Sequence, residues 1–219
     1  MRNRTLLWIL AVVITLAAAI YQRTTGPTYE KEITFRLKGK SYTGEFPRSS
    51  SVEDSCRITL DIPSDVDARL FFKRFPTNDD WSEQDFRKQD QRQTAALPPQ
   101  PPAGKLQYFV AIETDTNLVY IARNEPIIIR FKGKVSDGVL ITHVLLMFSA
   151  MLFSTLAGLF ALRKIPRYRL YGLITLILLF LGGFIFGPIM QYQAFGDAWT
   201  GIPFGWDLTD NKTLIAFVG

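Results

Sequence analysis

The sequence predicts a membrane protein that combines an all-β sandwich with an α-helical transmembrane hairpin. Two observations predict this fold class. Two apolar runs lie between Val139 and Met190, and each exceeds the roughly 18 residues that mark a membrane-spanning helix. Ahead of them, short segments alternate apolar and polar residues with the period of two that is typical of strands.

Charge is distributed unevenly along the 219 residues. Residues 22–137 hold 18 of the 25 Lys and Arg and 17 of the 20 Asp and Glu, so the signs nearly cancel there. Most of the net charge of +5 therefore arises beside the apolar runs, from Arg2, Arg4, Arg163, Lys164, Arg167, Arg169 and Lys212. Basic residues in such places set membrane topology, so we expect no nucleic-acid partner.

The chain begins with a basic segment, residues 1–4, and an uncharged run follows at 5–21. Two interpretations fit this run: a signal peptide cleaved near Ala17–Ala19, or an uncleaved signal anchor that forms a first transmembrane helix. We favour the anchor, because the run is longer than the apolar part of a usual signal peptide. Both interpretations place residues 1–4 in the cytoplasm and the chain from residue 22 outside.

Residues 22–137 are expected to form a small antiparallel β-sandwich outside the membrane. Strands are predicted at 33–37, 56–62, 69–75, 106–112, 118–121 and 127–131. The stretches 49–54 and 76–93 are predicted as solvated loops, the second with salt bridges. Asp79, Asp80, Glu83 and Asp85 in the second stretch do not have the spacing of a calcium-binding loop and basic residues flank them, so we expect no metal there.

Cys56 is the only cysteine, which excludes an intrachain disulfide. In a strand, Cys56 would lie on the same face as Ile58 and Leu60, and this pattern predicts a thiol buried in the core.

The segment 94–110 contains a proline-rich turn that ends at Gly104, and Tyr108 follows early in the next strand. It resembles the corner between late strands of immunoglobulin-like and fibronectin type III-like domains, where a tyrosine hydroxyl bonds back to the turn backbone. The resemblance implies an immunoglobulin-like sandwich, a fold that binds and scaffolds more often than it catalyses. The whole arrangement is similar to multi-span bacterial inner-membrane proteins with an external immunoglobulin-like insertion.

The second and third transmembrane helices are predicted at 138–162 and 170–190, joined by the basic connector 163–169. The positive-inside rule places this connector in the cytoplasm. Two helices separate it from residues 1–4, so both basic segments lie on the same side, as the rule requires. The aromatic loop 191–213 then lies outside. Residues 214–219 are too few to cross a hydrocarbon core of about 30 Å, and we interpret them as the start of a truncated fourth helix.

The sequence has no P-loop, dinucleotide-binding motif, zinc-ligand spacing or nucleophile elbow, so we favour a non-enzymatic role without a cofactor. His143, the only histidine, is the single candidate site residue. It lies roughly 7 Å below the outer end of its helix, a depth that suits an axial ligand of haem b, where two histidines from different helices hold the iron. The favoured alternative is a neutral histidine hydrogen-bonded to the outer loop.

Three functions stay open. The favoured one is a structural or interaction module of a membrane assembly, whose partners are the lipid bilayer and other membrane protein subunits. The second is a haem-binding subunit of a membrane redox enzyme that uses His143. The third is a transporter component, which the lack of charged residues inside the two apolar runs disfavours. The expected location is the bacterial inner membrane, with residues 22–137 periplasmic or extracellular.

Overall fold

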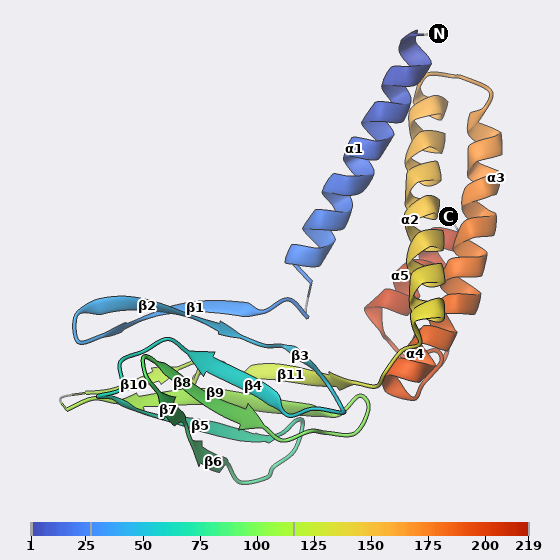
Figure 1. The fold of residues 1–219 in the computed structure, drawn as a ribbon. Helices are drawn as coiled ribbons and strands as arrows, with labels where there is room; N and C mark the ends of the chain where they lie inside the picture. Colours follow the sequence, from blue (N-terminus) through green and yellow to red (C-terminus); the bar gives the residue numbers. More distant parts are fainter. Residues whose placement is uncertain (1, 27, 116, 219) are drawn as a thin grey trace. The chain divides into compact units, whose positions relative to one another are not determined.

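The computed structural model describes residues 2–26, 28–115 and 117–218, with side chains from Arg4 onward. Met1 and Gly219, the ends of the first and last predicted segments, lie outside these ranges, as does the Arg2 side chain. The chain divides into two compact units (Figure 1). We name residues 26–134 the β unit, and the residues up to Thr25 together with those from Val135 onward the helical unit.

The described part of the β unit contains eleven strands in three sheets. In chain order the strands are β1 Lys31–Leu37, β2 Lys40–Phe46, β3 Ser49–Ser51, β4 Cys56–Leu60, β5 Asp67–Arg74, β6 Ser82–Asp85, β7 Arg87–Gln89, β8 Arg92–Leu97, β9 Lys105–Glu113, β10 Leu118–Ile121 and β11 Ile127–Lys132. The largest sheet has the order β3-β11-β9-β5-β6, with β10 also paired to β9. The other two are the hairpin β1-β2 and the sheet β4-β8-β7.

Two stretches predicted as loops contain strands instead. Residues 49–51 form β3, which pairs in parallel with β11 at the edge of the largest sheet. The stretch 76–93 contains β6, which pairs with β5, and β7, which pairs with β8. These short strands are polar, so their sequences show no apolar alternation. Backbone hydrogen bonds to a neighbouring strand keep them extended instead. The predicted salt bridge in this stretch is present, since Arg74 Nε lies 2.7 Å from Asp79 Oδ2.

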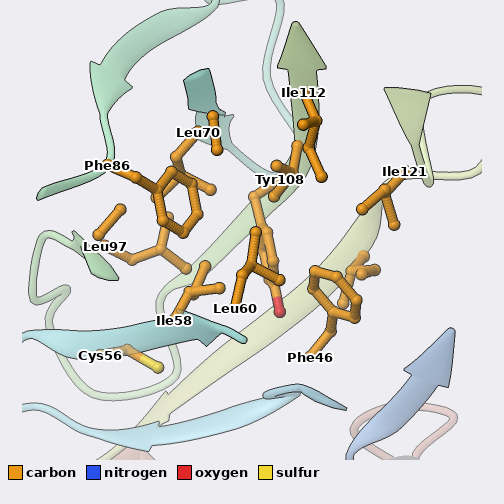
Figure 2. Close-up of a cluster of buried hydrophobic side chains, with 14 of the residues drawn as sticks. Phe46, Cys56, Ile58, Leu60, Leu70, Phe86, Leu97, Tyr108, Ile112 and Ile121 are labelled. Carbon is orange, nitrogen blue, oxygen red and sulfur yellow. The ribbon is translucent and has the colours of Figure 1, made fainter. Parts of the chain in front are cut away.

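One cluster of buried apolar side chains fills the β unit and draws on all three sheets (Figure 2). Alternate residues of β4 and β9 enter it, because successive side chains of a strand point to opposite faces. Cys56 lies in this cluster, so the prediction of a buried thiol is confirmed. Burial raises the pKa of the Cys56 thiol, which keeps it protonated and unreactive at neutral pH.

Tyr108 lies in the middle of the same cluster, and burial raises the pKa of its hydroxyl. The hydroxyl donates to the carbonyl oxygen of Pro47 at 2.8 Å, sixty-one residues earlier in the chain. The predicted hydrogen bond from Tyr108 to the turn before β9 is therefore wrong. The bond ties β9 instead to the segment between β2 and β3, and the sheets bring these segments together.

The helical unit contains three helices long and apolar enough to cross a membrane. Its elements are α1 Arg2–Thr24, α2 Asp137–Leu162, α3 Tyr168–Leu179, the π-helix η1 Phe180–Phe186, α4 Gly187–Phe195 and α5 Leu208–Val218. The third of the long helices is the continuous run of α3, η1 and α4. α2 and α3 run antiparallel, side by side (Figure 1).

Glycines line the π-helix where other elements approach it closely. A Cβ atom on Gly182 would lie 3.0 Å from atoms of Leu146 and Met147 on α2. A Cβ on Gly183 would lie 2.5 Å from Thr213 Cγ2 on α5. A side chain at Gly183 would therefore force Thr213 to shift, and one at Gly182 would require Leu146 or Met147 to move by a few tenths of an ångström, so both glycines allow a close helix contact.

The first turns of α1 pack at the same end of the helical unit as the basic connector between α2 and α3. Leu7 and Ala11 join Leu156, Phe160 and Tyr171 in a second buried cluster. Trp8 meets Phe153 and Tyr171 edge to face, with ring centroids 6.1 and 5.8 Å apart. The arginines at the start of α1 and the basic connector thus lie at one end of the helices (Figure 1).

Candidate functional site

His143, the candidate from sequence, lies near the start of α2 and faces the π-helix. Its Nδ1 is 2.9 Å from the carbonyl oxygen of Gly182. A carbonyl can only accept, so Nδ1 donates its proton, and in the neutral ring Nε2 carries the lone pair. The ring also lies against Gly187, where an added Cβ would be in ordinary van der Waals contact with His143 Cε1, at 3.6 Å. The expected hydrogen bond to the outer loop 191–213 is therefore wrong.

A polar cluster lies at the end of the helical unit away from the basic connector, and it centres on Asp210, which is only 6% exposed. Its Oδ2 accepts hydrogen bonds from the Thr200 backbone amide at 2.7 Å, the Thr200 hydroxyl at 3.1 Å and Gln191 Nε2 at 3.1 Å. Gln191 Nε2 also donates to Thr200 Oγ1 at 2.9 Å. These contacts join α4, the following loop and the first turn of α5.

The same cluster fixes where α5 begins. Asp207 Oδ1 accepts from the backbone amides of Thr209 and Asp210 at 2.8 and 3.2 Å, which is an N-terminal helix cap. Asn211 Oδ1 accepts from the Ile202 amide at 2.8 Å. Asp210 Oδ2, Asp207 Oδ1 and Asn211 Oδ1 thus all accept hydrogen bonds from groups of the same chain. The role that these contacts support is to hold the loop between α4 and α5 in one conformation.

The β unit carries aromatic residues on the side of its largest sheet that faces away from the core cluster. Phe109 is 7% exposed yet lies outside that cluster, and the neighbouring β9 residues Tyr108 and Val110 lie inside it. Phe71 on β5 is the register partner of Phe109, and the two rings stack 4.8 Å apart at 5°. Residues of one strand alternate between faces, so both rings lie on the outer face.

Two further rings extend this row across the sheet. Trp81, next to β6, meets Phe109 edge to face at 4.8 Å, and Tyr120 on β10 meets it from the other direction at 6.2 Å. Trp81 is 38% exposed and Tyr120 is 41% exposed. We name Phe71, Trp81, Phe109 and Tyr120 the aromatic row.

A cation stacks on each exposed ring at the two ends of the aromatic row. Lys73 Nζ lies 5.1 Å from the centre of the Trp81 ring, and the Arg123 guanidinium lies 4.1 Å from that of Tyr120. Such cation–π contacts already restrict the long side chains of Lys73 and Arg123. Binding of a partner would therefore cost little further side-chain entropy. Beyond the rings, Arg69 binds Glu113 at 3.0 Å on the same face. The row thus presents rigid apolar rings with ordered positive charge at its edges.

Sequence reasoning missed the aromatic row because its members come from four separate segments. Phe71 and Phe109 read as parts of apolar strands, and Trp81 lies in a stretch predicted as a loop. One signal was present: the β9 segment Tyr108-Phe109-Val110 is apolar at both parities, so one of its residues has to face outward. Only the strand register shows that the four rings meet.

No protein-family model matches this sequence, and a search of curated proteins finds no match either.

Proposed function

We propose that this protein is a membrane-anchored interaction module, whose β unit binds another membrane protein subunit through the aromatic row. The observation that carries the proposal is the aromatic row, whose end rings Trp81 and Tyr120 are exposed and carry stacked cations. Trp, Tyr and Arg are the residues in which binding energy concentrates at protein interfaces. Their rings are already packed against one another, so a partner would have little side-chain motion to freeze.

The three long apolar helices support the membrane part of the proposal. They cross the bilayer with the start of α1 and the basic connector in the cytoplasm, which satisfies the positive-inside rule. The β unit, which follows α1 and precedes α2 in the chain, is then outside. In a bacterium this location is the periplasmic side of the inner membrane. We further propose that the β unit is an immunoglobulin-like sandwich, which suits a binding role.

Site-specific photo-crosslinking in membranes of the source cells tests the partner. A photoreactive phenylalanine analogue replaces Tyr120 in the full-length chain, and a control chain carries it at Tyr29, which is exposed but lies outside the aromatic row. We expect one recurrent adduct with a membrane protein from position 120 and none from position 29. Trp81→Ala in the position-120 chain should reduce the adduct about tenfold or more, since anchor residues of this type contribute about 2 kcal/mol.

Two outcomes would contradict the proposal. Equal adducts from positions 120 and 29 would show non-specific proximity, and an adduct that survives Trp81→Ala would show that the aromatic row is not the contact. Expression of the Trp81→Ala chain at the level of the parent chain in the same membranes serves as the folding control.

A second function, haem binding at His143, is favoured by one specific observation. Histidines that ligate a metal ordinarily donate their other ring nitrogen to a carbonyl or carboxylate, and His143 Nδ1 has such a partner in Gly182. In this function Nε2 of His143 would hold the haem, and the haem b would supply electron transfer. The sequence contains a single histidine, so a second histidine would have to come from outside these 219 residues.

The visible spectrum of the purified full-length protein tests this alternative. A haem protein would show a Soret band that is lost in His143→Leu and retained in Thr142→Ala, the matched change at the adjacent residue. A colourless parent protein, purified from cells grown with a haem precursor, would exclude this function and leave the interaction proposal untouched.

A further inference from the structure

One end of the outer sheet face in the β unit is basic, at a distance from the aromatic row. Lys105 and Arg130 are register partners on β9 and β11. Lys132 follows Arg130 by two residues, on the same face of β11. Arg48 lies beside Arg130, because the Arg130 amide donates to the Arg48 carbonyl oxygen at 3.1 Å. Lys134 comes next along the chain. We name these five residues the basic end.

The positive charges of the basic end lie close enough to act on each other. Burial lowers the pKa of the Lys132 ammonium, and the nearby Arg130 guanidinium lowers it further. Like charges directly opposite each other on neighbouring strands destabilise a sheet, and Lys105 opposite Arg130 is such a pair. An anion from outside the chain that lies near Lys105 and Lys132 would reduce the repulsion on these two lysines.

Ion pairs elsewhere in the β unit use other cations. Within the described ranges, salt bridges join acidic residues to Lys31, Lys38, Arg69, Arg74, Lys88 and Arg92. Lys105, Lys132 and Lys134 form none with the described residues. The nearby acidic residues Glu53 and Asp54 come directly after Val52, whose amide donates to the Lys132 carbonyl. Neither forms a salt bridge with the described residues. These lysines are thus available to an external anion.

Only a few residues separate the basic end from a helix of membrane-crossing length. Lys132 ends β11 and Asp137 begins α2, one of the three helices long enough to cross a membrane. The four residues between them span no more than about 18 Å when fully extended. Lysines next to a membrane-spanning segment meet the phosphates of anionic lipids, and each contributes about 1 kcal/mol near the surface.

We propose that the basic end binds the phosphate groups of anionic lipids at the outer surface of the bilayer. Lys105, Lys132 and Lys134 provide the charge, and Arg130 shapes the patch between them. This inference rests on the proposed membrane location of the helices. It gives the β unit a preferred side toward the lipid, which would leave the aromatic row, whose Phe109 lies four residues beyond Lys105 on β9, for a protein partner.

Lysine acylation in nanodiscs tests the inference on the full-length chain. The protein is reconstituted in phosphatidylcholine alone or mixed with phosphatidylglycerol, and the acylation rate of each lysine is read by mass spectrometry. We expect Lys105 and Lys132 to react about fivefold more slowly in the anionic nanodiscs, and the difference to vanish in high salt. Lys40, which is exposed on β2, is the internal control and should react equally in both.

Variants separate the patch from a general effect of surface charge. The triple variant Lys105→Gln, Lys132→Gln, Lys134→Gln should lose most of its preference for phosphatidylglycerol over phosphatidylcholine among co-purifying lipids. A control with three other exposed cations removed, Arg36→Gln, Lys40→Gln and Arg57→Gln, should keep it.

Three results would overturn the inference. These are equal slowing of Lys40, equal lipid preference in both triple variants, or full protection by inorganic phosphate in neutral nanodiscs, which would assign a free-anion site instead. Failure of the chain to enter nanodiscs at all would overturn the membrane location itself. Normal insertion without lysine protection would overturn this inference alone.

Discussion

The β unit and the helical unit bury their side chains in opposite ways. In the β unit the large apolar residues are inside, and the charged residues form exposed ion pairs at the surface. In the helical unit most large apolar residues point outward, as Ile9, Leu145 and Leu173 do, and the interior contacts use glycines and interlocking rings. Water drives the first arrangement, whereas the second suits a solvent as apolar as the side chains themselves.

Polar groups show the same contrast. The β unit places its charges where water can solvate them, so single ion pairs there contribute little to stability. The helical unit keeps a carboxylate, Asp210, almost fully buried, with three donors around one oxygen. A buried charge of this kind has to be satisfied by hydrogen bonds, so its loss should be costly. Stability in the two units therefore depends on different residues.

The largest expected effect is in the core of the β unit. Leu70 on the central strand β5 is fully buried, and Leu70→Ala should lower the free energy of unfolding of the β unit by about 2–5 kcal/mol through the cavity it leaves. Proteolysis of the β unit across a urea series measures the effect. Leu118→Ala, at an exposed position on β10, is the control and should cost well under 1 kcal/mol. Equal losses would mean that the core does not determine stability.

The next effect is in the polar cluster of the helical unit. Asp210→Ala removes the acceptor of three hydrogen bonds and should cost about 2–3 kcal/mol, measured as unfolding of the helical unit in mixed detergent and SDS. Asp197→Ala, an exposed aspartate in the same loop, should change little. The β unit should be unaffected by both variants. A loss shared by the two units would show that they do not unfold independently.

A close helix contact gives a smaller effect that can be reversed. Gly183→Ala places a methyl group 2.5 Å from Thr213 Cγ2 and should cost about 1–3 kcal/mol in the same assay. Adding Thr213→Ser removes that Cγ2 and keeps the hydroxyl, so the double variant should recover most of the loss. Gly172→Ala, at an open position of α3, should be neutral. No recovery in the double variant would place the strain somewhere other than this contact.

The smallest effect concerns a single hydrogen bond inside the β unit. Tyr108→Phe removes the donor to Pro47 and should cost about 1 kcal/mol, with the ring still filling the core. Tyr42→Phe on β2 removes a half-exposed hydroxyl and serves as the control. Urea unfolding of the β unit measures both. A Tyr108→Phe variant as stable as its parent would show that the bond to Pro47 contributes nothing.

The sequence alone predicted the features that depend on local pattern. The six strands with apolar alternation coincide with observed strands, and the long apolar runs coincide with the helices of membrane-crossing length. The burial of Cys56 followed from its parity with Ile58. Polar edge strands such as β3 and β6 were not predictable in this way, because a neighbouring strand and not their own pattern holds them extended.

The partners of individual side chains depended on the tertiary structure. Sequence reasoning expected hydrogen bonds from His143 to the outer loop and from Tyr108 to the turn before β9, and in the structure both residues bond other backbone carbonyls. The acceptor of His143 is the Gly182 carbonyl in a π-helix, and which carbonyl the ring reaches depends on how α2 packs against that helix. The aromatic row and the basic end likewise arise only when strands distant in sequence lie in register.

Composition and periodicity thus determined which residues enter the β core and which segments suit a bilayer, since both depend on the affinity of each side chain for water. The tertiary structure decided which residues meet across strands and helices. Pair contacts depend on register and on approach distances of a few ångströms, and neither is set by the residue types alone.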